Sequence, residues 1–463
     1  MLNLIKKDEM KKEVKLLLGE PKKAILRISG PMMMGMMVQS LYNLADGAWV
    51  AGLGTGQLSA IGLFFPFFFI IVAVGVGLGA GGGSAISRRI GERNKVAADN
   101  TALHTLIGGT AISLVISILL FPLIKPLFLV FSSNERVAQL TTDYSQILVG
   151  GSFLLIFNNL ANAIMHGEGD SKRPMYVQIF SAILNIILDP IFIYSFDMGI
   201  KGAAWATMAS ILISSLIFCY WLFFKRNTYL CLAIRNYKYN LNIIKEILGV
   251  GIPAIFAQIS MSISMIFMNI VVIRVAGTDG VAILTSGWRI IMLGSIPLMG
   301  LASGVIIVCA AAFGAQKKEK LRTAFFYSIK IGLLLECTVG FFIFLFAEQV
   351  AIIFTYSEKS NNIHESLVVF LRYMVFLYPS IPFGMLSSSF FRGVNHGGKS
   401  LILTILRTII LQIPCMYIGG VVLDYGLIGI WVGIIIGNFV AVAISFFWAL
   451  FTLKHIKWQK FID

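Results

Sequence analysis

Apolar residues along this chain form long continuous runs, and the short segments between these runs hold most of the charged residues. Each run has about 20 residues or more, enough for an α-helix to cross the roughly 30 Å hydrocarbon core of a bilayer. The runs do not alternate with polar residues, which argues against membrane-spanning β-structure. The pattern predicts an all-α membrane protein with twelve spans, at about residues 24–50, 57–85, 99–121, 139–165, 174–195, 202–224, 245–273, 281–312, 323–347, 366–390, 400–420 and 427–452.

The composition agrees with this prediction. Hydrophobic residues make up 57% of the 463 residues and charged residues only 13%, with a mean hydropathy of +0.85. A soluble protein carries roughly a quarter charged residues. The five cysteines have no metal-binding or redox spacing, and the polar leader 1–23 is unlike a signal peptide. We therefore expect an integral membrane protein with no soluble domain and no cofactor.

The basic residues are distributed unevenly between the two sides of the predicted membrane. Of the 37 Lys and Arg residues, 28 lie in the leader, the tail and alternate loops, whereas five lie in the loops of the opposite side. Cytoplasmic loops carry such an excess of positive charge. The asymmetry predicts a multi-pass protein of the cell membrane with both termini in the cytoplasm. The net charge of +15 is therefore explained by membrane topology and by attraction to membrane lipids, and it does not indicate binding of nucleic acid.

The second half of the sequence repeats landmarks of the first at a nearly constant offset of 222 to 227 residues. The matching pairs are Pro31 and Pro253, Gly91 and Gly314, Gly167 and Gly393, Pro190 and Pro414, and Gly202 and Gly429. Duplicated halves in a membrane protein indicate a secondary transporter. Since each half has an even number of spans, the expected pseudo-two-fold axis lies along the membrane normal. We expect a leader (1–23), a six-helix bundle (24–225), a linker (226–241), a second six-helix bundle (242–452) and a tail (453–463).

Two aspartates, Asp46 and Asp189, lie within apolar runs at comparable depth in the predicted outer half of the membrane. A carboxylate there costs about 2.5–3.5 kcal/mol on insertion scales and indicates a functional site. Asn185 lies one helical turn before Asp189, Pro190 leaves the carbonyl of Ile186 without a donor, and Thr207 lies in the same layer. Such oxygen ligands suit Na⁺, and two close carboxylates can instead share a proton. The alternative is that Asp46 meets interfacial water and Asp189 caps a kinked helix.

Several motifs resemble the multidrug and toxic compound extrusion (MATE) family of antiporters. They are Tyr42-Asn43-Leu44-Ala45-Asp46, Ser87-Arg88-Arg89-Ile90-Gly91, His166-Gly167-Glu168-Gly169-Asp170-Ser171-Lys172, Asn185-Ile186-Ile187-Leu188-Asp189-Pro190 and Gly202-Ala203-Ala204-Trp205. The resemblance covers nearly the whole chain and is weaker in the second half. In the archaeal-type branch of this family, the residues at the matching motif positions form the coupling-cation site. The resemblance therefore implies such a site here at Asp46, Asn185, Asp189 and Thr207. The acids that another branch carries on the seventh and tenth spans are absent here.

Other residues of the spans are weaker candidates for function. Gln39, Tyr42, Met36 and Trp49 on the first span are candidates for the wall of a substrate cavity, because Met-rich and aromatic surfaces suit varied ligands. Lipid-facing packing is the alternative for the methionines. Glu336, near the middle of the ninth span, is either a second protonatable site or the partner of Arg289.

The sequence as a whole predicts a monomeric secondary antiporter, not an enzyme. It would export amphipathic, cationic organic compounds in exchange for Na⁺ or H⁺ by rocking of its two halves. A flippase for lipid-linked oligosaccharides with the same architecture is the alternative, although it would need cationic residues in its cavity. A membrane-embedded transferase would need clustered acids, histidines or arginines with metal-ligand spacing, and the sequence has no such cluster.

Overall fold

The computed structural model describes residues 11–131, 134–225, 228–355 and 363–456, and this part of the chain contains helices and no β-strand. The α-helices are α1 (Lys12–Leu18), α2 (Pro21–Ala51), α3 (Thr55–Gly91), α4 (Lys95–Leu120), α5 (Ile124–Phe131), α6 (Glu135–Gly150), α7 (Ser152–Gly167), α8 (Lys172–Pro190), α9 (Gly199–Cys219), α10 (Leu241–Gly294), α11 (Ile296–Gly314), α12 (Lys318–Leu345), α13 (Ala347–Thr355), α14 (His364–Met374), α15 (Ile381–Gly393), α16 (Gly397–Ile405), α17 (Gln412–Tyr417) and α18 (Gly426–Lys454). Short 3-10 or π-helical turns are η2 (Phe121–Leu123), η3 (Ile191–Ser195), η4 (Tyr220–Phe224), η5 (Ile234–Asn236), η7 (Val375–Leu377), η8 (Leu406–Leu411) and η9 (Ile418–Val422).

Several spans are built from more than one of these helices. The fourth span bends by 46° between α6 and α7, and the tenth bends by 52° between η7 and α15. Helix α10 contains the seventh span and, beyond Gly277, the beginning of the eighth, which continues in α11. Gly277 divides α10 because its φ of 60° lies outside the helical region and is readily adopted by glycine.

The predicted all-helical architecture of twelve spans is confirmed. The first span, α2, is less apolar than the others because it carries Gln39, Asn43 and Asp46. It begins at Pro21, where proline suits the first turn of a helix, and α1 occupies part of the predicted leader. Residues 1–10, 226–227 and 457–463 of the predicted leader, linker and tail lie outside the described residues.

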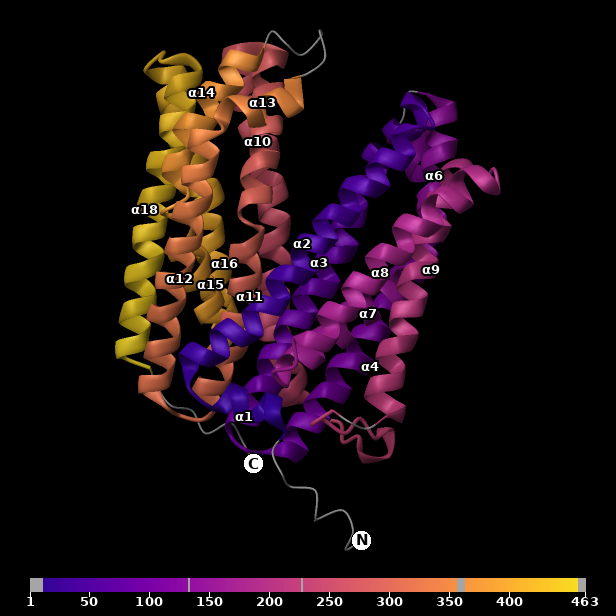
Figure 1. Cartoon of the computed structure of the whole chain (residues 1–463), viewed down its shortest axis with the longest axis vertical. Helices are drawn as coiled ribbons and strands as arrows, with labels where there is room; N and C mark the ends of the chain where they lie inside the picture. Colours follow the sequence, from indigo (N-terminus) through magenta and orange to yellow (C-terminus); the bar gives the residue numbers. More distant parts are fainter. Residues whose placement is uncertain (1–10, 132–133, 226–227, 356–362, 457–463) are drawn as a thin grey trace, which may run out of the picture.

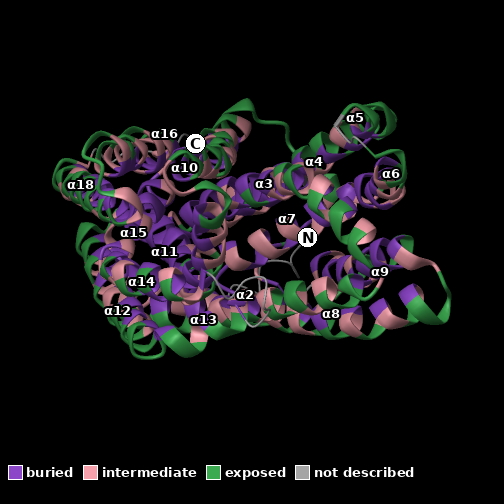
Figure 2. Ribbon diagram, turned by 90° about the horizontal axis from the view of Figure 1, so that it is seen from above, coloured by how far each residue is buried: buried purple, intermediate pink, exposed green. Residues whose placement is uncertain are grey.

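The spans form two groups that touch at one end of the molecule and diverge toward the other (Figure 1). The first group contains α2 to α9, and the second contains α10 to α18. We call the end where α1 lies the closed end and the end where α6 and α13 lie the open end. Buried residues are abundant along α3, α11 and α15, whereas exposed residues line the perimeter of the molecule (Figure 2).

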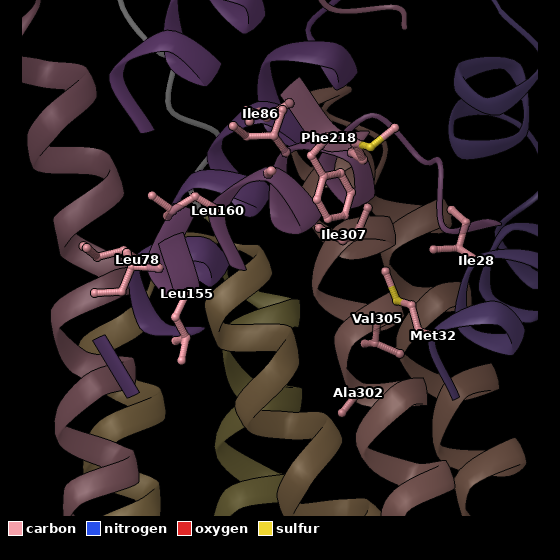
Figure 3. Packing of buried hydrophobic residues seen from close by; sticks show 14 of the residues in the cluster. Ile28, Met32, Leu78, Ile86, Leu155, Leu160, Phe218, Ala302, Val305 and Ile307 are labelled. Atoms are coloured by element: carbon pink, nitrogen blue, oxygen red, sulfur yellow. The ribbon is translucent and has the colours of Figure 1, made fainter. Parts of the chain in front are cut away.

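Glycines allow the two halves to touch at the closed end. A Cβ atom on Gly81 of α3 would collide with the carbonyl of Ile247 on α10, and one on Gly304 of α11 would collide with Ser29 on α2. Small residues at such positions let membrane helices approach backbone to backbone. Apolar side chains fill the space around them: Ile28, Met32 and Val305 belong to one buried cluster, in which Met32 lies beside Val305 (Figure 3). The closed end is therefore a packed interface between the halves.

Candidate functional site

The two intramembrane aspartates lie close together on neighbouring helices of the first half. Asp46 is near the end of α2, and Asp189 is the penultimate residue of α8. The two helices pack against each other, and the carboxylates are close enough to interact electrostatically. Asp189 is fully buried, and Asp46 is partly exposed. The predicted pairing of these acids is thus present in the structure, near the open end.

Asn185 and Thr207 connect this acid pair to α9. Asn185 lies one turn before Asp189 on the same face of α8, as helical spacing requires. With the amide orientation assigned from its hydrogen-bonding partners, Asn185 Nδ2 donates to Asp189 Oδ2 at 2.8 Å, and its Oδ1 accepts from the Thr207 N–H at 3.2 Å. All four residues predicted for the cation site therefore lie around one point.

Two tyrosines complete the walls of this site. The side chain of Tyr42, one turn before Asp46 on α2, lies close to Thr207 and within electrostatic range of both carboxylates. Tyr144 of α6 is buried and lies within electrostatic range of both carboxylates. Sequence reasoning missed Tyr144, because a tyrosine in a predicted span, unlike an acid, does not stand out against its apolar neighbours. The site therefore draws on four helices of the first half: α2, α6, α8 and α9.

Pro190 shapes the backbone beside Asp189. A proline has no N–H to donate to the carbonyl four residues earlier, which here belongs to Ile186. The chain passes directly from α8 into the π-helical turn η3, so the regular α-helical bonding ends at the acid. Such turns often occur at functional sites, because they redirect backbone groups.

The acid pair has no basic partner among the residues that the structure describes. One oxygen of each carboxylate, Asp46 Oδ1 and Asp189 Oδ1, is buried and accepts no hydrogen bond. The ion pairs of the described residues include neither aspartate. Within the same residues, no cluster of three His, Cys, Asp or Glu side chains is arranged to hold a metal ion. Two close carboxylates with free oxygens can accept a proton or a hard monovalent cation.

The residues predicted for a substrate cavity separate in the structure. Tyr42 belongs to the acid site, whereas Gln39 is exposed and Met36 is half-buried farther along α2. Trp49 lies near the open end, where its ring meets Tyr194 edge to face at 6.4 Å and its carbonyl accepts a hydrogen bond from the Tyr194 hydroxyl at 2.7 Å. The prediction of a cavity wall formed by these residues stays a prediction.

The alternative explanation of Glu336 as the partner of Arg289 is wrong. Glu336 on α12 is fully buried, and neither of its carboxylate oxygens has a hydrogen-bonding partner. Arg289 is exposed on α10 and makes no ion pair with it. The sequence placed both residues in the membrane, but it could not show that their side chains point in different directions.

A second polar cluster, which the sequence did not predict, joins the two halves at the closed end. Arg88 at the end of α3 is fully buried, and its Nε lies 2.8 Å from Glu246 Oε1 on α10. Its Nη1 donates to the carbonyl of Gly393 at 3.1 Å, and Nη2 donates to Asn395 Oδ1 at 3.2 Å. Arg89 Nη2 lies 2.9 Å from the other oxygen of Glu246. One glutamate of the second half thus pairs with two arginines of the first, and Arg89 also pairs with Glu92 of its own half at 3.1 Å.

The chain is similar to known transporters over nearly its whole length. The family model MatE matches residues 31–191 and 253–418, one segment in each half. The multidrug export protein MepA of Staphylococcus aureus is 26% identical over 414 residues, which cover 88% of this chain and 89% of that protein.

Solved structures of transporters superpose closely on this fold. A structure described as the outward-facing conformation of a multidrug resistance MATE family transporter is 46% identical, with a TM-score of 0.94 and coverage of 98% of this chain and 100% of that one. A transporter from Pyrococcus furiosus is 46% identical, with a TM-score of 0.93 and coverage of 96% of this chain and 99% of that one. That transporter is reported to have a binding pocket of reverse polarity, which suggests a different function for it. The chain belongs to the MatE family and is a multi-pass membrane transporter, not an enzyme.

Proposed function

We propose that this transporter exports amphipathic, cationic organic compounds in exchange for Na⁺ or H⁺. The observation that carries this proposal is the acid pair of Asp46 and Asp189, whose free oxygens lie inside the membrane with no basic partner. An intramembrane charge is costly, so such a pair persists where it binds an ion. The names of related multidrug exporters support the substrate class.

Alternating access would follow from the arrangement of the two halves. They touch at the closed end and diverge toward the open end, where the acid pair lies (Figure 1). The excess of basic residues in the closed-end loops supports a cytoplasmic position for this end. The cation would therefore enter from outside, and its binding would favour the conformation with lower affinity for the exported compound. Because the binding effects are reciprocal, the exported compound would in turn favour release of the cation.

Efflux in proteoliposomes of defined orientation tests this proposal. An imposed Na⁺ gradient, an imposed pH gradient and no gradient are compared for the efflux of ethidium, an amphipathic cation. One gradient should drive efflux in the wild type, and Asp46→Asn and Asp189→Asn should abolish the gradient-driven part. The matched control is Asp143→Asn, which neutralises an aspartate of the first half that pairs with Lys201 outside the acid site. Efflux that neither gradient drives would refute the proposal.

A second candidate function is the transport of an anionic, lipid-linked compound, and Arg407 favours it. Arg407 lies in the turn η8, in the middle of the eleventh span, and a Cβ atom on Gly384 of α15 would be 3.7 Å from its Nη1. Among the described residues, its guanidinium makes no ion pair or hydrogen bond. An arginine stays charged in the membrane and needs an anionic group or water as its partner. If an anionic lipid-linked sugar is moved and ethidium is not, this second function replaces the first.

A further inference from the structure

The second half of the molecule contains a polar site that the acid pair of the first half does not explain. Its centre is Glu336 on α12, which is fully buried and has no hydrogen-bonding partner at either carboxylate oxygen. About 14 Å of helix separates it from the end of α12 at Leu345, at 1.5 Å per residue. The carboxyl group thus lies well inside the helix, and the residue has no exposed surface.

The face of α12 that carries Glu336 points into the second half and not toward lipid. Gly332 and Gly340 lie one turn before and one turn after Glu336, on the same face. A Cβ atom on Gly332 would lie 3.0 Å from Leu298 of α11 and 3.1 Å from Pro382 of α15, and one on Gly340 would lie 3.2 Å from Tyr378. The carboxyl group is thus enclosed by α11, α15 and the segment that precedes α15.

Two more buried polar groups without partners lie on this side of α12. Tyr378 is fully buried, its hydroxyl has no hydrogen bond, and it interacts electrostatically with Glu336. The same hydroxyl would be 2.9 Å from a Cβ atom on Gly294, and the next residue, Ser295, has a buried hydroxyl without a partner. Buried polar groups are nearly always satisfied in native structures, so a cluster of unsatisfied groups calls for an explanation.

Both of these unsatisfied polar residues lie at breaks between helices. Ser295 separates α10 from α11, and Tyr378 lies at the 52° bend between η7 and α15. Broken helices within the membrane commonly form the ion sites of transporters and are the points at which their spans move. A movement at either break would change the surroundings of Glu336.

No positive charge balances Glu336 in this conformation. Of the titratable groups, Tyr378 is the one with which it interacts, and the ion pairs of the described residues do not include it. The arginines of neighbouring spans do not form an ion pair with Glu336, because Arg289 is exposed and Arg407 lies against Gly384. An ionised carboxylate without donors in an apolar interior is far more costly than a neutral carboxyl group.

We propose that Glu336 is a second proton-binding site, which holds one proton in the conformation described and exchanges it when the breaks at Ser295 and Tyr378 move. In this step a proton from water binds one carboxylate oxygen and gives a neutral carboxyl group, and the reverse step returns it to water. The binding of a proton by Glu336 in this conformation does not depend on which compound is exported. The exchange during transport rests on the proposed antiport.

Infrared spectroscopy of the reconstituted protein at neutral pH tests this proposal directly. The wild type should show the C=O stretching band of a protonated carboxyl group, and Glu336→Gln should lose the corresponding intensity. Tyr378→Phe should shift this band, because the hydroxyl next to the carboxyl group is removed. The matched control is Glu348→Gln on α13, an exposed glutamate paired with Arg372, which should leave the band unchanged.

Each outcome of this experiment decides the proposal. An unchanged band in Glu336→Gln shows that the carboxylate is ionised and overturns the proposal. So does loss, when Na⁺ is added, of the part of the band that is present in the wild type and absent in Glu336→Gln. Glutamine has the size of a protonated glutamate, so Glu336→Gln should also keep the wild-type melting temperature at neutral pH. A clear loss of stability would instead indicate an ionised, partnered carboxylate. The spectrum requires no transport, so failure of the antiport proposal is distinguishable from failure of this one.

Discussion

Glu246→Gln should loosen the contact between the two halves at the closed end. The glutamate pairs with Arg88 and Arg89 at distances of 2.8 and 2.9 Å, and both arginine side chains are almost completely buried. Glutamine keeps the size of the side chain and one acceptor oxygen, but it removes the negative charge. Arg88 would remain buried with acceptors that carry no charge: the carbonyl of Gly393, Asn395 Oδ1 and the remaining amide oxygen of the glutamine.

The magnitude follows from the burial of the pair. Removing one partner of a buried ion pair costs about 3–5 kcal/mol, because the other charge stays buried and uncompensated. Glutamine retains part of the hydrogen bonding, which favours the lower end of this range. A cost of about 3 kcal/mol corresponds to roughly a hundredfold change in the equilibrium between contacting and separated halves. A minor population with an opened closed end should therefore become readily detectable.

Distances between spin labels at the closed end measure this change. The labels are placed at exposed positions at the start of α4 (Val96) and α16 (Gly398), after replacement of the exposed Cys231 and Cys337 by serine. The matched control is Glu92→Gln. Glu92 also binds Arg89, at 3.1 Å, but it belongs to the same half and makes no bond across the interface. If both variants gave the wild-type distance distribution, the cluster would not hold the halves together, and the reasoning would be refuted.

Three further predictions concern other parts of the chain. Burial raises the pKa of Glu168, in the loop after α7, from 4.5 to about 7, so the folded state favours its protonated form. Its contribution to stability is fully present below about pH 4.5 and is lost as the pH rises through 7, a difference of about 3 kcal/mol. This pH dependence should disappear in Glu168→Gln when the melting temperatures of variant and wild type are compared across pH. Gly81→Ala should destabilise the closed end by about 1–3 kcal/mol through its clash with Ile247, measured as a lower melting temperature, whereas Gly108→Ala, which meets no neighbouring atoms within 4 Å, should not. Asn185→Ala should remove the hydrogen-bond donor to Asp189. A hydrogen bond to a charged group contributes about 1.5–3 kcal/mol, so gradient-driven efflux should fall about tenfold or more. Unchanged efflux would show that this amide does not support the site.

The sequence was sufficient to predict the spans because the membrane imposes a simple rule on them. Each crossing must be long, apolar and helical, so twelve runs translate directly into twelve spans. The bends could not be predicted in the same way. The 46° bend between α6 and α7 and the 52° bend before α15 each fall inside one predicted span, 139–165 and 366–390, whereas the break at Gly277 falls between two predicted spans. Such features depend on contacts between spans, which periodicity does not encode.

The acid site was predictable for a similar reason, because acids are rare in apolar runs. Asp46, Asp189 and Asn185 stand out against their neighbours, and helical spacing relates the last two. Tyr144 and the cluster around Arg88 do not stand out in this way. Arg88 lies in a basic loop-proximal segment in which most arginines are topology anchors, and its partner Glu246 is 158 residues away. Only the packing of α3 against α10 brings this pair together.

The duplication of the chain makes the difference between its two halves informative. The halves share helix order, glycine landmarks and the bent fourth span of each bundle, at 46° and 52°. The charged residues discussed above that lie within the spans are nevertheless different: the first half has two acids on α2 and α8, whereas the second has Glu336 on α12 and Arg407 in η8. The charges that the two proposals assign to ion binding lie on different spans of the two halves, with Asp46 and Asp189 on α2 and α8 and Glu336 on α12. Under these proposals, the duplicated halves would move as equivalent bundles but would bind ions at positions that the duplication does not relate.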